Sequence, residues 1–169
     1  MQNLKLILSV LLLVLTSCGY KLAGGGYLNS DVTHVAVEMM EDKSQATGAG
    51  VIFTNALIKE ISEKTDTKIV DDTTKAIAIL KGRINSITFA TLSRSTTESV
   101  VERRISASVD MQLVDQGGQI IWSVKNFVSK EEYKVSDDKN TDDSNKIDAV
   151  VKISIRNAEK LVTRMVNRF

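Results

Sequence analysis

A strict alternation of apolar and polar residues between positions 104 and 113 constrains the fold of this chain more than any other feature. Successive side chains of a strand point to opposite faces of a sheet, so this segment predicts a strand with one dry face and one wet face. Apolar side chains of other helices or strands must therefore pack against the dry face. The apolar set is Ile105, Ala107, Val109, Met111 and Leu113, and the polar set is Arg104, Ser106, Ser108, Asp110 and Gln112.

Two strands are predicted before this segment. Apolar residues alternate with others from 35 to 39, which predicts a short first strand. Residues 76–89 are rich in isoleucine and predict the second strand. Its inward parity changes between Ile84 and Ile87, which indicates a bulge.

One strand is predicted after it. Residues 115–119 contain Gly117 and Gly118, two residues that tolerate a positive φ, and they predict a turn. Residues 120–133 then return as the fourth strand. We expect Trp122 and Val124 to face the core.

Two amphipathic helices are predicted. Thr47 is a candidate N-cap for the first helix, whose inward face carries Phe53, Leu57 and Ile61 at four-residue spacing. The second is a long closing helix with the basic row Arg156, Lys160 and Arg164 on its exposed side. Its predicted inward positions are Ile147, Val151, Ala158, Leu161, Met165 and Phe169.

Two polar segments, 91–101 and 136–145, are predicted to be loops. The first is a long hairpin loop or a pair of frayed strand ends. The element order is therefore β-α-β-β-β-α. It predicts an α+β fold in which two helices pack on one face of a four-stranded, mainly antiparallel sheet.

The N-terminus carries the marks of a secretory signal. Lys5 precedes a short apolar run that is too short to span a bilayer permanently, and small residues precede Cys18. This pattern predicts cleavage after residue 17 and acylation of Cys18, and several acyl chains on one cysteine anchor a domain firmly to a membrane. Gly19, in place of an aspartate, indicates the outer membrane. The alternative is an ordinary signal peptide with a chance cysteine. The expected organisation is a signal peptide at 1–17, a lipidated tether at 18–33 and a single domain at 34–169.

The composition argues against several function classes. The chain has 22 basic and 21 acidic residues, and removal of Lys5 makes the two numbers equal. We therefore expect no positively charged surface of the kind that binds nucleic acid. His34 is the only histidine and begins a predicted strand, which favours a strand-end role over catalysis. No zinc-binding cluster or phosphate-cradling loop is recognisable. The aspartate pairs at 71–72, 137–138 and 142–143 lack the ligand spacing of a calcium loop. We expect no catalytic residue, no cofactor and no metal.

The segment from Cys18 to Leu22 (Cys-Gly-Tyr-Lys-Leu), followed by glycines, resembles the mature N-terminus of the LptE family of lipopolysaccharide-assembly lipoproteins. Residues 76–84 and the stretch from Gly118 to Trp122 resemble the second strand of that family and its turn into a tryptophan-bearing strand. The resemblance implies a non-enzymatic protein of the outer membrane that faces the periplasm. It also implies an LptD-type β-barrel as partner, which the protein plugs and helps to assemble, and lipopolysaccharide as ligand.

Lipopolysaccharide carries anionic phosphates, so its contacts require cations. The ends of the second and fourth strands and the starts of the third strand and the closing helix are expected at one pole of the sheet. Each cation there is equally well explained as a solvated surface charge with acidic neighbours. The candidates are Arg94, Arg103, Arg104, Lys130, Lys134 and Lys139.

A different function remains open from the residues alone. A small lipid-anchored α/β domain also suits a periplasmic adaptor of another lipid-transport system, of the ABC type. The wet face of the third strand does not decide between the two, because any half-exposed antiparallel strand shows such a face.

Overall fold

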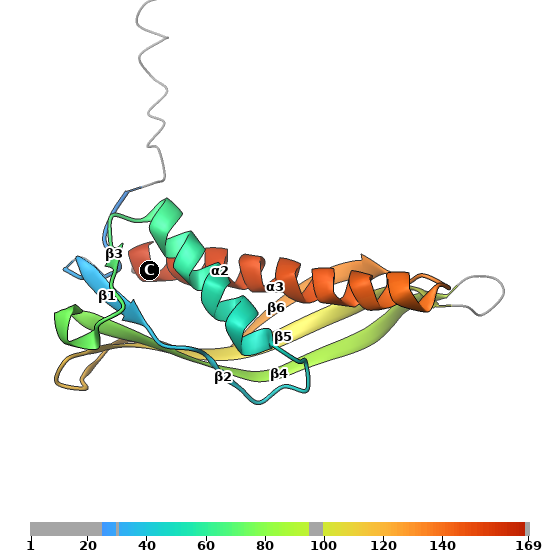
Figure 1. The fold of residues 1–169 in the computed structure, drawn as a ribbon, viewed down its shortest axis with the longest axis horizontal. Coiled ribbons are helices and arrows are strands. Elements are labelled where there is room, and N and C mark those ends of the chain that lie inside the picture. The colour runs from blue at the N-terminus through green and yellow to red at the C-terminus, as the bar shows by residue number, and fades with distance from the viewer. Residues whose placement is uncertain (1–24, 30, 95–99, 168–169) are drawn as a thin grey trace, which may run out of the picture.

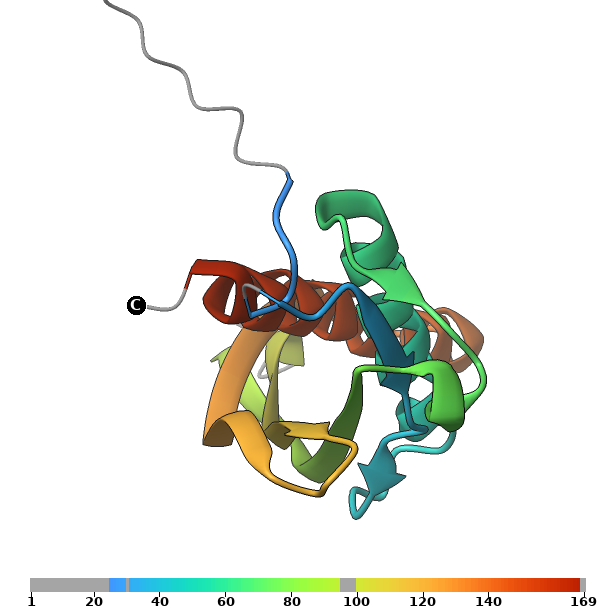
Figure 2. The same ribbon diagram turned by 90° about the vertical axis from the view of Figure 1, so that its left-hand side faces the viewer.

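The computed structural model describes residues 25–29, 31–94 and 100–167. Two helices, α2 (Ala49–Lys64) and α3 (Lys139–Asn167), lie on one face of a curved sheet, as Figure 1 and the turned view in Figure 2 show. The opposite face of the sheet carries no helix among the described residues. The α+β class and the two-helix layer are confirmed.

The sheet has six strands and not the four that were predicted. Its main path is β3-β1-β4-β5-β6, and β2 pairs with β4 beside β1. β2 and β3 have two residues each, which is too short to show an alternation. The strands are β1 (His34–Val37), β2 (Glu41–Asp42), β3 (Lys68–Ile69), β4 (Ala78–Arg94), β5 (Val100–Asp115) and β6 (Ile120–Lys134).

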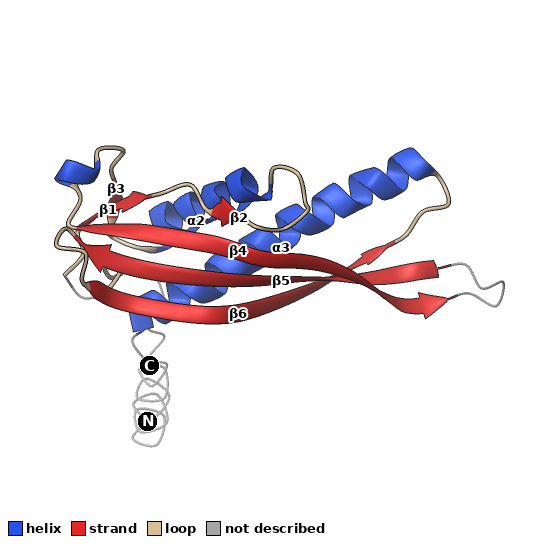
Figure 3. Cartoon of the chain, turned by 90° about the horizontal axis from the view of Figure 1, so that it is seen from below, coloured by secondary structure: helices blue, strands red, loops and turns tan. Residues whose placement is uncertain are grey.

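The antiparallel character is confined to the three long strands, β4, β5 and β6, which Figure 3 shows side by side from below. β1 is parallel to β3 and to β4, and β2 is parallel to β4. A parallel pair requires a long crossover connection, and the segment with α2 supplies it between β1 and β4. The prediction of a mainly antiparallel sheet therefore holds for β4, β5 and β6, whereas the short strands β1, β2 and β3 pair in parallel.

The core lies between the helices and the sheet. The alternating residues of β5 from Ile105 to Leu113 are buried, as predicted, and Leu80 and Ile84 of β4 lie beside them. Trp122 and Val124 pack against this core and are partly buried. The predicted bulge in β4 is present, because its pairing with β5 shifts between Ile84 and Ser86.

The first helix begins differently from the prediction. Gly48 is its N-cap residue, with a left-handed backbone at φ 78°, and no side chain caps the helix. Thr47 therefore does not serve as the cap. The predicted inward face of Phe53, Leu57 and Ile61 is buried, as expected.

The second helix begins earlier than predicted. Residues 139–145, assigned to a loop, form its first turns. Asp138 caps them, because its Oδ2 accepts bonds from the Thr141 N–H at 2.8 Å and the Thr141 hydroxyl at 2.7 Å. The segment reads as a loop because it contains no apolar residue that would reveal a helical period.

The inward face of the N-terminal half of α3 was also predicted wrongly. Ile147 is 61% exposed and Val151 is exposed as well. Ile147 and buried Met165 are five full turns apart and lie on the same side of the helix, so the side of α3 that is buried changes along its length. The residues that are buried in this half are Ala149, Val150, Ile153, Ser154 and Asn157.

The chain before β1 contributes to the core. Leu28 and Val32 are fully or almost fully buried. The Leu28 N–H donates to the Thr67 hydroxyl at 2.8 Å, and that hydroxyl donates to the Val32 carbonyl at 2.8 Å. The packed domain thus begins several residues before residue 34.

Candidate functional site

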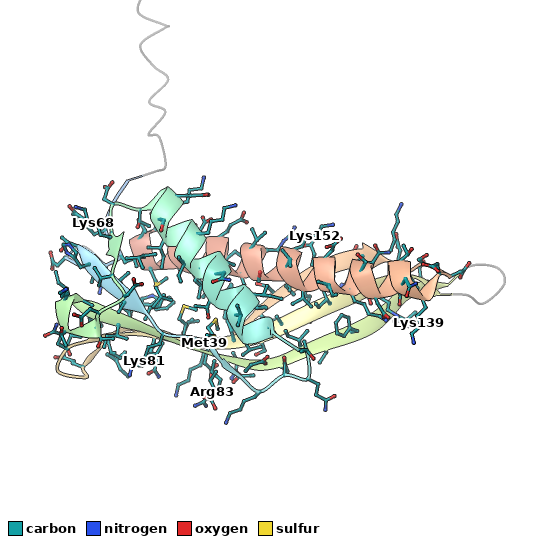
Figure 4. All side chains as sticks on the ribbon, in the orientation of Figure 1. Met39, Lys68, Lys81, Arg83, Lys139 and Lys152 are labelled. Atoms are coloured by element: carbon teal, nitrogen blue, oxygen red, sulfur yellow. The ribbon has the colours of Figure 1, made fainter. Side chains whose placement is uncertain are left out.

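The structure gathers the elements of the predicted cationic pole at one end of the sheet. The end of β4 pairs with the start of β5, the end of β6 lies beside the start of β5, and α3 begins nearby. Figure 4 shows Lys139 at this end and Lys68 at the opposite end. We call this end the hairpin pole.

The six candidate cations divide between the two faces of the sheet. Arg104, Lys130 and Lys134 belong to the wet face, where Lys130 lies opposite Ser106 and Lys134 lies opposite Glu102. Arg103 lies opposite Tyr133 on the helix-covered face. Lys139 is the exposed first residue of α3. Arg94 pairs with Val100 through its backbone, and its side chain lies outside the described part of the chain.

Acidic side chains interrupt the positive charge at the hairpin pole. Arg104 Nη2 contacts Glu132 Oε1 at 2.7 Å across the wet face. Lys130, Lys134 and Lys139 form no ion pair with any carboxylate among the described residues. These three lysines are therefore the better placed of the candidates for an external anion.

Arg103 is engaged with the start of α3. The pKa of the Asp142 carboxyl is lowered first by the hydrogen bond from Lys146 and in smaller part by the charge of Arg103. The ammonium of Lys146 lies 2.8 Å from Asp142 Oδ2, and this contact raises the pKa of Lys146. The Lys146–Asp142 pair thus stabilises the first turns of α3, and Arg103 adds to the positive charge near Asp142.

A groove of about 400 Å³ separates the end of β6 from α3. Asn145 Nδ2 bridges it with a bond of 3.0 Å to the Lys134 carbonyl. Asn145 was not singled out from the sequence, because residues 136–145 were assigned to a loop. Lys152 belongs to the predicted closing helix and was not proposed either. The groove is lined by Glu102, Glu132, Tyr133, Lys134, Asn145, Asp148 and Lys152.

A second groove, of about 470 Å³, lies on the wet face of the sheet, and Figure 4 shows Lys81 and Arg83 on that side. Its cations are largely neutralised. Lys81 Nζ lies 3.4 Å from Glu38 Oε1, and Arg83 Nε lies 2.7 Å from Glu41 Oε2. The parity of β4 would have placed Lys81 and Arg83 here, but they were not proposed.

Asp110 of β5 links the neighbouring strands β4 and β6 in the middle of the wet face. Its Oδ1 accepts a bond from the Asn126 N–H at 2.7 Å and another from Asn85 Nδ2 at 2.8 Å. The bond from Asn126 is the main cause that lowers the pKa of Asp110, and burial opposes it. Asn126 has a left-handed backbone with φ 50°, at the position where the pairing of β5 with β6 shifts.

His34 and Asp72 form local contacts. His34 Nδ1 lies 3.0 Å from the Thr33 hydroxyl at the start of β1. Asp72 accepts a bond from the Thr74 N–H in a short 3-10 turn, Thr73–Lys75. Among the described residues, no group of three or more histidine, cysteine or acidic side chains is arranged to hold a metal ion. Cys18 and the predicted signal peptide at 1–17 lie outside the described residues. Within the described part of the chain, no helix is both long and apolar enough to cross a membrane.

The fold is one that solved bacterial lipoproteins share. The chain is similar to lipoprotein B from Nitrosomonas europaea, with a TM-score of 0.56, 17% identity and coverage of 88% of this chain and 90% of that one. It is similar to rare lipoprotein B from Shewanella oneidensis, with a TM-score of 0.51, 16% identity and coverage of 78% and 92%. A PelC dodecamer from Paraburkholderia phytofirmans gives a TM-score of 0.52, 14% identity and coverage of 83% and 94%.

These likenesses define the fold class, a small α+β domain. The sequence defines the family, because the LptE lipopolysaccharide-assembly model matches residues 32–165. The chain belongs to the LptE family, and the resemblance inferred from its short motifs is confirmed. None of the curated proteins compared with the chain matches it in sequence.

Proposed function

We propose that this chain is a lipid-anchored, non-enzymatic lipoprotein of the outer membrane that plugs an LptD-type β-barrel and assists its assembly. In this role it takes part in the transport of lipopolysaccharide to the outer leaflet. The observation that carries the proposal is the family match over residues 32–165, which includes nearly all of the described domain.

The uncovered sheet face supports a place inside a barrel. The lumen of a large outer-membrane barrel is polar, so a protein that fills it needs a polar surface. Ser106, Ser108 and Gln112 of β5 lie on the face that carries no helix, and Lys81, Arg83 and Arg104 on this face are paired with glutamates. A polar, hydrogen-bonding face of this kind suits a hydrated wall better than it suits an apolar membrane.

The hairpin pole supports contact with lipopolysaccharide. Lys130, Lys134 and Lys139 offer ammonium groups that no described carboxylate neutralises. Hydrogen bonds between an ammonium and a phosphate are stronger than neutral ones. We assign these three residues the main role, with Arg94, Arg103 and Arg104 as further candidates.

Co-purification from outer membranes tests the proposal. The full-length lipoprotein is tagged at its C-terminus, extracted in mild detergent and captured, and the partners are identified by mass spectrometry. An LptD-type barrel in near-stoichiometric amount is expected, together with a mature N-terminus that begins with acylated Cys18. Capture of an inner-membrane lipid transporter in its place would favour the adaptor function.

A further inference from the structure

The chain enters the packed domain beside the C-terminal end of α3. The Gly26 carbonyl accepts the Asp66 N–H at 3.1 Å just beyond the end of α2, and a Cβ placed on Gly26 would lie 3.4 Å from Val166 Cγ1. Figure 2 shows the first described residues next to that end of α3. The segment that joins them to Cys18 is therefore attached to the end of the domain that lies opposite the hairpin pole.

This attachment is short. Residues 18–24 span at most about 25 Å when fully extended, whereas the 29 residues of α3 extend over about 43 Å. An acyl anchor on Cys18 therefore holds the C-terminal end of α3 near the membrane surface and lets the hairpin pole lie far from it. In the proposed function the anchor lies in the lipid around the barrel, so this end of the domain must lie at the mouth of the barrel, beside the lipid headgroups.

Two cations of the basic row lie toward this end of α3. Lys160 and Arg164 are exposed, and neither forms an ion pair with a carboxylate among the described residues. Arg156, the third member of the row, differs from them, because its Nε lies 2.8 Å from Glu131 Oε2. Lys160 and Arg164 are therefore available to an external anion.

Both cations line a groove of about 450 Å³ between β6 and α3. The guanidinium carbon of Arg164 lies 4.6 Å from the centroid of the Phe127 ring, and this stacking orients the guanidinium before any ligand arrives. Side chains four residues apart on a helix are neighbours. Lys160 and Arg164 can therefore approach one anion together.

The groove also has an apolar border. Val128 of β6 is 50% exposed there. The acid of the groove, Glu159, lies near Glu60 of α2, because burial and in smaller part the charge of Glu159 raise the pKa of Glu60. An anionic group with apolar neighbours, as in a phospholipid, fits this combination. The groove is lined by Phe127, Val128, Glu159, Lys160, Thr163 and Arg164.

We propose that Lys160 and Arg164 bind the phosphate of an anionic phospholipid in the membrane that carries the anchor. The proposal rests on the lipid anchor of the proposed function. The acyl chains keep this end of the domain near the headgroups, and the two cations then determine which side of α3 faces them. Attraction to an anionic leaflet falls off within a Debye length, about 8 Å at physiological salt, so only the end of the domain beside the anchor benefits from it.

Fluorescence quenching in vesicles tests the proposal. The mature lipoprotein carries a fluorophore on Asn167→Cys, about one turn beyond Arg164, and is reconstituted in phosphatidylcholine with or without phosphatidylglycerol. A short-range quencher is attached to the headgroup of a trace lipid. Quenching is expected in the anionic vesicles and should be at least about fivefold weaker in pure phosphatidylcholine or in about 1 M salt, where the Debye length is about 3 Å. A fluorophore on Asn140→Cys, near the hairpin pole, is expected to remain unquenched.

Charge substitutions identify the residues responsible. Lys160→Gln/Arg164→Gln is expected to lower the quenching in anionic vesicles to the level seen in neutral ones. Lys160→Gln alone keeps the stacking of Arg164 on Phe127 and is expected to give an intermediate value, which separates lost charge from disturbed packing. The matched control, Lys139→Gln/Lys152→Gln, removes the same charge from the N-terminal half of α3 and is expected to behave as the wild type.

Three results would overturn the membrane contact: equal quenching in neutral and anionic vesicles, no quenching in either, or quenching that survives the double substitution. Absence of quenching would leave the two cations to an acidic protein surface. Failure of the anchor is recognised separately, because Cys18 is the only cysteine of the chain. A fluorophore that attaches to the chain without an added cysteine would show a free Cys18 thiol and would overturn the anchor itself, together with the contact that depends on it.

Discussion

The carboxylate of Asp110 holds the backbone of Asn126 across the sheet, with 2.7 Å between Oδ1 and the Asn126 nitrogen. The same oxygen receives the Asn85 side chain at 2.8 Å, so one carboxylate on β5 braces the bulges of both neighbouring strands. Bulges bend a strand and increase its twist. The curvature of the three long strands therefore depends in part on one side chain of the wet face.

Replacement of Asp110 by alanine is expected to destabilise the fold. The change removes the acceptor of two hydrogen bonds, one of them to a backbone N–H. The free energy of unfolding is expected to fall by about 1 kcal/mol, at the low end for a charged acceptor because the site is partly open to solvent. Chemical denaturation at neutral pH measures it. Ser108→Ala, on the same face of β5, is the matched control and is expected to leave stability nearly unchanged.

The contribution of Asp110 is expected to depend on pH. Its pKa in the folded protein is lowered, so folding favours the charged form. The stabilisation is complete above the unfolded pKa, which is about 3.9 for an aspartate, and it is lost as the pH falls through the folded value. The gap in stability between the wild type and Asp110→Ala should narrow below about pH 4. A gap that widens on acidification would contradict the assigned charge state.

Two isoleucines of α3 provide a test of the helix phase. Ile153 is fully buried, whereas Ile155 is 42% exposed. Ile153→Ala is expected to cost about 2–5 kcal/mol, the range for a large-to-small change in a packed core. Ile155→Ala is expected to stay within about 0.5 kcal/mol of the wild type. Equal losses in thermal or urea unfolding would show that α3 is rotated relative to its position here.

The lysines of the hairpin pole are expected to bind lipopolysaccharide. Replacement of Lys130, Lys134 and Lys139 by alanine should weaken binding by roughly tenfold to a hundredfold, since each exposed cation contributes at most about 1 kcal/mol. Thermal stability should hardly change. The control replaces Lys64, Lys68 and Lys75, which lie away from this pole, and removes the same charge. Equal affinity of the two variants would place the ligand elsewhere, with the row Arg156, Lys160 and Arg164 as the next site to examine.

Much of the larger half of the fold is predictable from residue patterns. The alternation from Arg104 to Leu113 predicts the central strand because burial on one face alone imposes a period of two. The parity change after Ile84 likewise predicts its bulge. β2 and β3 are not predictable in this way, because two-residue strands formed by backbone pairing leave no side-chain period.

The candidate site was predictable only in part. The order of the strands places the hairpin pole correctly, but it does not show which cations are already engaged. The ion pair of Arg104 with Glu132 depends on the register between β5 and β6, and the influence of Arg103 on Asp142 depends on where α3 begins. That start is set by the Asp138 cap, a local hydrogen bond within a segment that has no apolar period.

The most direct test of the proposed function is a photocrosslink from the wet face of the sheet. A photoreactive amino acid in place of Ser108, in the middle of that face, is irradiated in intact cells that carry the lipoprotein in their outer membrane. The expected product is a covalent adduct between this chain and an LptD-type barrel, identified by mass spectrometry and absent without irradiation. A lipoprotein that reaches the outer membrane but forms no barrel adduct from Ser108 would contradict the placement of this face against the barrel wall.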